Sequence, residues 1–264
     1  MNMYLSLFKK NLRLSFVYRS NIYISIISIL SFTMLQYFLW KAIYSVNEST
    51  EISFSQMISY ILFGVFIKLF TTCNISQYIS DEVGKGSIEL ALIKPYSFFL
   101  YHLFRHLSSL LFELISKGTV LFIVCFSVFS EYITFSNEWS NMFYFVFCLF
   151  VAVTLSFFLD YIIGLISFWI IQTWQMKFLI TDFGNILSGY FVPLWFFPKV
   201  IYNISEYLPF KYMYFMPINV ILGTIPQSEF LRYAIIQIAW LLLLGLIIMY
   251  LWKNCRTKVL IQGG

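Results

Sequence analysis

The chain has 264 residues, of which 60% are hydrophobic, 22% aromatic and 11% charged, and its formal net charge is +5. Its mean hydropathy is +0.81. A soluble domain carries roughly 25% charged residues. The charge here is too sparse to cover a soluble globule, which excludes an ordinary cytosolic enzyme. Since one span takes about 20 residues, the sequence predicts an all-α membrane protein with about six spans in one transmembrane domain, residues 1–264.

Residues 3–19 are predicted to form an amphipathic helix. Apolar side chains recur at spacings of three and four, at Leu5, Phe8, Leu12 and Phe16. Basic side chains fill the opposite face, at Lys9, Lys10 and Arg13. Such a helix lies in the plane of the lipid headgroups, with its basic face toward anionic lipid. A cleaved signal peptide is the alternative, but no small-residue cleavage site follows the apolar run.

Six apolar segments are predicted to span the membrane. They cover about residues 22–40, 55–79, 107–130, 141–166, 176–192 and 231–252. Most of the 17 Lys and Arg residues fall on the same side of these spans as the N-terminus. Because cytoplasmic loops carry the excess of Lys and Arg, both termini are expected in the cytoplasm. An even number of spans agrees with that orientation.

The prolines gather in one stretch. All but one of the six lie between residues 193 and 226, among many Phe, Tyr and Trp residues. Proline interrupts helices, and irregular backbone exposed to lipid is not tolerated. We therefore expect a pair of short re-entrant or interfacial helices on the outer side, between the fifth and sixth spans and packed against the other spans. The prolines that organise this outer cap are Pro193, Pro198, Pro209 and Pro217.

A polar segment from Asp81 to Pro95 separates the second and third predicted spans. Its Gly-Lys pair superficially resembles a phosphate-binding loop. However, Ile79 and Gly86 stand where that loop needs glycine and Ser or Thr, so nucleotide binding is excluded. Residues 87–93 are predicted to form one or two helical turns that Pro95 stops. Two interpretations stay open: a cytoplasmic helix that docks a soluble partner, and an ordinary inner loop.

Ionisable residues also fall within the predicted spans, at Lys68, Glu113, Lys117, Asp160 and Asp182. Such residues are costly in hydrocarbon and carry a functional hypothesis. Glu113 and Lys117 share a helix face and are expected to pair. Lys68 lies at a similar depth, so a three-way cluster with that pair is geometrically allowed. Either these five groups line a translocation path or hinge, or they neutralise one another and reach the headgroups.

No catalytic or metal site is expected. His102 and His106 have metal-ligand spacing on a predicted helix, but no third ligand is evident. The cysteines have no such spacing and act as small hydrophobes: Cys73, Cys125, Cys148 and Cys255. The chain has no nucleophile motif and no basic surface for nucleic acid.

Several motifs follow one another in a recognisable order. They are Tyr4-Leu5-Ser6-Leu7-Phe8-Lys9-Lys10 with Tyr18-Arg19, the segment Gly86–Pro95, the pair Phe168-Trp169, and Ser188-Gly189 with Pro193-Leu194, Phe197-Pro198, Leu208-Pro209-Phe210 and Pro217. Together they resemble the permease subunits of type-2 ABC exporters, in a branch of six-span bacterial permeases of similar length. The resemblance covers nearly the whole chain. One departure is Ile170-Ile171-Gln172-Thr173, where the family has acidic residues after the Phe-Trp pair.

The resemblance implies a half-transporter in the bacterial cytoplasmic membrane. This permease would pair with an identical or paralogous second permease and with a separate ABC ATPase that binds ATP and magnesium. The chain itself would need no cofactor and would not be an enzyme. The coupling helix that contacts the ATPase would contain Gly86, Ser87, Glu89, Leu90, Leu92, Lys94 and Pro95.

The implied function is ATP-driven export. The abundance of aromatic residues favours an amphipathic or hydrophobic cargo, such as a peptide, a lipid or a drug. The first alternative is a secondary transporter, but residues 1–130 and 131–264 show no internal repeat. A membrane enzyme or a non-transporting membrane immunity protein is the second alternative.

Overall fold

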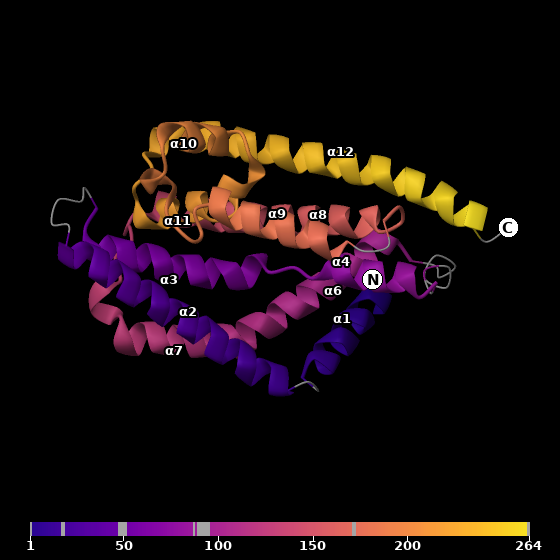
Figure 1. Cartoon of the computed structure of the whole chain (residues 1–264), viewed down its shortest axis with the longest axis horizontal. Coiled ribbons are helices and arrows are strands. Elements are labelled where there is room, and N and C mark those ends of the chain that lie inside the picture. Colours follow the sequence, from indigo (N-terminus) through magenta and orange to yellow (C-terminus); the bar gives the residue numbers. More distant parts are fainter. Residues whose placement is uncertain are drawn as a thin grey trace.

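The computed structural model describes residues 2–16, 19–46, 52–86, 88, 96–170 and 173–262, and over these residues the protein is all-helical. The long helices run roughly along the longest axis of the molecule (Figure 1). They are α2 (Arg19–Val46), α3 (Phe54–Thr71), α4 (Ile75–Gly84), α6 (Phe98–Glu113), α7 (Thr119–Val128), α8 (Trp139–Ile166) and α12 (Phe230–Gln262).

Five segments are long and apolar enough to cross a membrane. They are Ile22–Val46, Phe54–Gly84, Phe98–Val128, Trp139–Ile166 and Gln227–Arg256. Long apolar segments thus lie where the first four spans and the sixth are predicted, and the boundaries of the spans stay predictions. Large apolar side chains project outward from them, such as Phe143 and Phe150 on α8 and Leu242 on α12. Because so much exposed apolar surface requires an apolar solvent, the chain is a multi-pass membrane protein.

The prediction of a full-length fifth span at residues 176–192 is wrong in its length. The helix at this place, α9 (Trp174–Leu187), has 14 residues, about 21 Å at 1.5 Å per residue, whereas a bilayer core is roughly 30 Å thick. It ends because Gly189 adopts a φ of +79°. A Cβ on Gly189 would lie 2.8 Å from the Tyr60 hydroxyl. The chain then continues without regular helix toward Pro193.

The end of α9 is nevertheless anchored to α2 and α3. The Tyr60 hydroxyl donates a hydrogen bond to the Gly189 carbonyl at 2.8 Å. The Gln36 side chain donates to the Phe191 carbonyl at 3.2 Å. These bonds satisfy carbonyls that the interrupted helix leaves free, which irregular backbone inside a membrane protein requires.

The Phe54–Gly84 segment lies at the centre of the molecule. In its most hydrophobic 18-residue stretch 61% of the residues are buried, against 11% for Ile22–Val46. Its first helix, α3, begins with a reciprocal cap. The Gln56 N–H donates to the Ser53 hydroxyl at 3.3 Å, and the Ser53 N–H donates to the Gln56 side chain at 3.2 Å. Helices α2, α6 and α8 pack against α3, and α6 and α8 also pack against α4.

The predicted N-terminal amphipathic helix is present as α1 (Asn2–Ser15). It lies at an angle to α2 and packs against α6 (Figure 1). The Tyr4 and Phe104 rings stack at 5.4 Å, and Phe16 meets Phe112 edge-on at 4.9 Å. The position of α1 in the headgroup plane stays a prediction.

Short helices follow α9, as the proline pattern predicts, and lie together at one end of the molecule (Figure 1). They are η3 (Leu194–Phe196), α10 (Lys199–Glu206), η4 (Pro209–Tyr212) and α11 (Phe215–Leu222). Pro193 and Pro198 precede η3 and α10, Pro209 begins η4, and Pro217 lies in the first turn of α11, where proline is tolerated. Residues 215–221 are all buried, against α3 and α8. Their re-entrant position in a bilayer stays a prediction.

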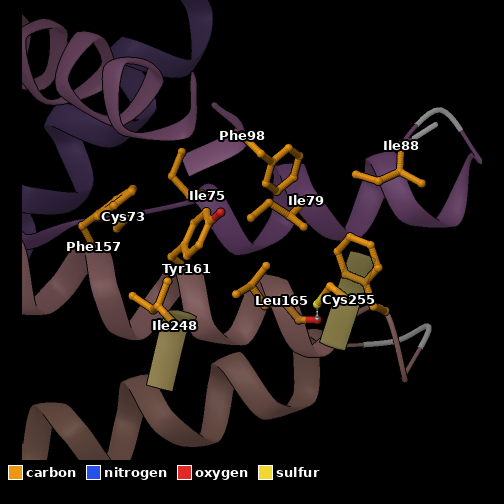
Figure 2. Close-up of a cluster of buried hydrophobic side chains, with 11 residues drawn as sticks. Cys73, Ile75, Ile79, Ile88, Phe98, Phe157, Tyr161, Leu165, Ile248 and Cys255 are labelled. Carbon is orange, nitrogen blue, oxygen red and sulfur yellow. Dashed lines mark hydrogen bonds between the residues drawn. The ribbon is translucent and has the colours of Figure 1, made fainter. Parts of the chain in front are cut away.

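A hydrophobic cluster fixes α4 to its neighbours (Figure 2). Ile79 of α4 packs with Phe98 of α6, with Tyr161 of α8 and with Cys255 of α12. Helices α4 and α8 approach closely at Gly164, where a Cβ would lie 2.7 Å from the Ile79 Cδ1 atom and 3.1 Å from the Ser76 Cα atom. The cluster therefore holds α4 as a unit against α6, α8 and α12.

Candidate functional site

The central segment is interrupted between α3 and α4. Residues 72–74 are not helical, and Thr72 is extended with a φ of −68° and a ψ of 120°. The Thr72 hydroxyl donates back to the Lys68 carbonyl at 2.7 Å. Thr and Asn side chains that bond the backbone compete with helix formation, and the sequence Thr71-Thr72-Cys73-Asn74 concentrates such residues here. The break lies inside residues 55–79, which are predicted as one continuous span, so that prediction is wrong in its continuity.

The N-terminus of α4 is capped by a carboxylate from another helix. Both the backbone N–H and the hydroxyl of Ser76 donate to Asp160 of α8, at 2.9 Å and 2.7 Å. Asn74 makes no side-chain cap of its own. A helix N-terminus presents free N–H groups and a partial positive charge, which favours an anion. Asp160 thus supplies the cap that the local sequence lacks.

Lys177 of α9 completes the network from the other side. Its ammonium group lies 3.1 Å from the Asp160 carboxylate. It also donates to the Cys73 carbonyl at 3.0 Å and to the Asn74 side chain at 3.1 Å. The Ser156 hydroxyl donates to the Thr71 carbonyl. The polar backbone of the break is therefore satisfied by side chains of α8 and α9, which is the condition for irregular backbone at membrane depth.

A pocket of about 190 Å³ opens beside the break, between α3, α8, α9 and η4. Its polar lining residues include Thr71, Asn74, Asp160, Lys177 and Asn185. Its apolar lining residues include Leu159, Ile163, Ile180, Phe210 and Met213. We call this the break pocket. An amphipathic lining of this kind contacts a polar group and an apolar group at once.

Lys68 lines the break pocket near the end of α3. Its ammonium group donates to the Asn185 side chain at 2.9 Å. It also lies over two aromatic rings, 4.9 Å from the centre of Tyr190 and 5.3 Å from that of Tyr214. Ring faces stabilise a cation, most strongly where water is excluded. Lys68 therefore remains in the interior without a direct carboxylate partner among the described residues.

The three-way cluster of Lys68, Glu113 and Lys117 does not form. Glu113 and Lys117 make the expected ion pair, at a π-helical segment, η1 (Leu114–Gly118), that joins α6 to α7. Lys68 instead points to α9. The sequence indicated that these residues lie at a similar depth along their spans. It did not indicate which face of its helix each residue occupies.

Of the five intramembrane groups, the structure brings Lys68 and Asp160 to one pocket, with Lys177 as an additional partner. Asp182 lies half-buried on α9 and acts on Lys68 through space. Glu113 and Lys117 form the separate pair on α6 and η1. Lys177 and Asn185 were not singled out by sequence reasoning. The only sequence signal was their spacing of about two turns on one helix, Lys177 to Asn185.

His102 and His106 lie buried on α6 among aromatic rings. Their nearest rings are Phe98 for His102, at 4.4 Å, and Phe157 for His106, at 5.4 Å. The His102 Nε2 atom lies 3.9 Å from a Glu82 oxygen. Within the described part of the chain, no group of three His, Cys, Asp or Glu side chains is placed to hold a metal ion.

The predicted coupling helix falls mostly outside the described residues. This applies to Ser87, Glu89, Leu90, Leu92, Lys94 and Pro95. Gly86 is described: it is exposed and has a φ of +68°, which suits a sharp turn after α4. Ile88 is buried in the cluster that holds α4 (Figure 2). The segment thus begins directly at the end of α4.

The sequence matches the ABC-2 family of transporter proteins over residues 24–263. This match covers most of the chain, so the protein belongs to that family of transmembrane transport subunits, which have no catalytic domain. A comparison with curated proteins found no match. The resemblance to the permease subunits of type-2 ABC exporters is therefore confirmed at the level of the family.

Proposed function

We propose that this protein is the permease subunit of an ATP-driven exporter in the bacterial cytoplasmic membrane. It forms the translocation path together with a second permease, identical or paralogous. A separate ABC ATPase binds on the cytoplasmic side. ATP and magnesium belong to the ATPase. The cargo is an amphipathic or hydrophobic molecule, such as a peptide, a lipid or a drug. Membership of the ABC-2 family supports this assignment.

The observation that carries the mechanism is the break at residues 72–74. On one side, α4 leads directly into the segment 86–95, the proposed coupling helix. On the other side, α3 lines the break pocket through Lys68 and Thr71. Movement of the coupling helix by the ATPase shifts α4, and the break lets α4 move without carrying α3 as a rigid rod. The pocket between α3, α8 and α9 then changes shape.

In this proposal both termini are cytoplasmic and the chain crosses six times. The fifth crossing is made by the short helix α9 together with the anchored segment 188–193. Residue 177 lies beside residues 73–74, and Gly189 lies beside Tyr60, so this stretch runs antiparallel to α3 through most of its length. Helices α10 and α11 form the outer cap of the exit.

The test is export by proteoliposomes that contain the permease and the ABC ATPase that co-purifies with it. Glu89→Lys and Leu92→Arg in the coupling segment should abolish ATP-dependent export and lower the stimulation of ATP hydrolysis by the permease. Lys253→Glu, an exposed charge reversal on α12, is the matched control and should leave both activities unchanged. Export that persists without ATP but follows an imposed ion gradient would instead support the secondary transporter.

A further inference from the structure

Lys68 differs from the other lysines that are removed from solvent. Lys117, Lys177 and Lys211 each pair with a carboxylate, from Glu113, Asp160 and Glu206 respectively. No carboxylate lies within 4 Å of the Lys68 ammonium group among the described residues. An uncompensated charge inside a membrane protein is costly and marks a binding or transport role.

The printed contacts of Lys68 involve only part of its ammonium group. An ammonium group has three N–H donors, and the Asn185 side chain takes one at 2.9 Å. The rings of Tyr190 and Tyr214 contribute cation–π interactions with the ammonium group, which are not conventional hydrogen bonds. Asp182 acts only through space. Among the described residues no other hydrogen bond from the Lys68 ammonium group is seen, and Lys68 lines the break pocket.

The size and lining of the pocket restrict the ligand. Sites for whole drug-sized molecules measure roughly 300–1,000 Å³, whereas the break pocket measures about 190 Å³. It therefore accommodates a head group rather than a complete cargo molecule. The apolar lining residues, among them Leu159, Ile163 and Phe210, suit the first carbons of an attached apolar chain.

We propose that the break pocket binds the carboxylate or phosphate head group of an amphipathic anion, and that Lys68 is the residue that recognises the charge. This rests on the proposed function and names the chemical class of the molecule that enters the path. Asn185 is a positioning residue, because its side chain orients the ammonium group. The same head-group chemistry occurs in a soluble cargo and in an anionic lipid.

The experiment measures binding to the purified full-length chain in phosphatidylcholine nanodiscs by calorimetry, with empty nanodiscs subtracted. The probes share a ten-carbon chain and differ in charge: decanoate, decyl phosphate, decanol and decyltrimethylammonium. Decanoate and decyl phosphate should bind saturably and about 10- to 100-fold more tightly than decanol, as expected for hydrogen bonds to a charged group. The cationic probe should bind no better than decanol.

Three variants assign this preference to Lys68. Lys68→Met should lower the affinity for the anions to that for decanol, whereas Lys68→Arg should retain most of it. Lys117→Met, which removes a lysine that Glu113 already neutralises, is the matched control and should bind like the wild type. Equal binding of anions and decanol by the wild type would overturn the proposal without any variant. Unchanged anion binding by a folded Lys68→Met protein would overturn it as well.

Nanodiscs that contain phosphatidylglycerol identify the source of the head group. If decanoate affinity falls as phosphatidylglycerol is added, the lipid itself competes for the site. If the affinity is unchanged, the site selects the soluble amphiphile, and both results keep the head-group site. The binding experiment needs no ATPase. If the wild-type chain supports ATP-driven export but binds anions no better than decanol, this inference alone is overturned. Intact anion binding without coupled export would instead overturn the exporter assignment.

Discussion

Asp160 of α8 caps the N-terminus of α4 by accepting two hydrogen bonds from Ser76, one from the backbone N–H at 2.9 Å and one from the hydroxyl at 2.7 Å. The two residues are 84 positions apart in the sequence. The N-terminus of α4 is thus stabilised by a carboxylate on the neighbouring helix α8. The Lys177 ammonium group, 3.1 Å away, neutralises that carboxylate. Any motion of α4 relative to α8 must strain or break these bonds.

Asp160→Asn is predicted to destabilise the folded protein by about 3 kcal/mol, because it leaves the Lys177 ammonium group without its counter-ion in a poorly solvated site. Lys177→Met in the same background should restore part of this loss, since the unpaired charge is then removed. The measurement is the free energy of unfolding of both single variants and the double variant in mixed micelles. If the effects of the two substitutions simply add, the ion pair is not coupled and the prediction is contradicted.

Gly164→Ala is predicted to destabilise the protein by about 1–3 kcal/mol, a cost typical of overpacking. The new Cβ would lie 2.7 Å from the Ile79 Cδ1 atom and 3.1 Å from the Ser76 Cα atom, so backbone must move. Gly245→Ala on α12 is the matched control, because the nearest atom to its Cβ is 3.8 Å away. Its melting temperature should stay equal to that of the wild type or rise slightly. Equal melting temperatures for the two variants would show that α4 and α8 are not in close contact.

Tyr60→Phe is predicted to lower the free energy of unfolding by about 1 kcal/mol, because the Gly189 carbonyl loses its buried hydrogen bond from the Tyr60 hydroxyl. Tyr250→Phe, on an exposed part of α12, serves as the control and should have no measurable effect. Limited proteolysis near residue 189 should also become faster in Tyr60→Phe alone. A proteolysis rate equal to that of the control would mean that this bond does not anchor the end of α9.

Hydropathy was sufficient to predict the long helices, since a run of apolar residues that meets lipid leaves little choice of structure. It was insufficient at the break, because hydropathy averaged over the length of a span does not resolve an interruption of three residues, 72–74. The groups that stabilise the break, Asp160 and Lys177, come from distant parts of the chain. A local pattern cannot report such partners.

The charged residues show the same difference between local partners, which the sequence predicts, and distant partners, which it does not. The pairing of Glu113 with Lys117 is local, at a spacing of four, and the sequence predicted it correctly. The partners of Lys68 depend on which face of α3 it occupies and on where α9 ends, and α9 ends early because of Gly189. Proline positions located the short helices after α9, and the large apolar residues around them indicated packing against the other spans, which α11 makes against α3 and α8.

The orientation of the chain can be tested with single cysteines and a membrane-impermeant maleimide. Tyr207, which follows α10 and is highly exposed, belongs to the proposed outer cap, so Tyr207→Cys should be labelled in intact cells. Lys9→Cys on α1 and Lys253→Cys on α12 are exposed positions near the two ends. Because the excess of Lys and Arg predicts that both ends are cytoplasmic, these two variants should be labelled only after the membrane is permeabilised.

The wild-type chain is the control for this labelling, since its own Cys73, Cys148 and Cys255 are buried and Cys125 is partly buried. Labelling of Lys9→Cys and Lys253→Cys on opposite sides would mean that α9 and the segment after it do not complete a crossing. The chain would then cross five times, and the outer cap would lie on the same side as the N-terminus. Because α10 and α11 follow α9 directly, labelling of Tyr207→Cys decides between these two topologies.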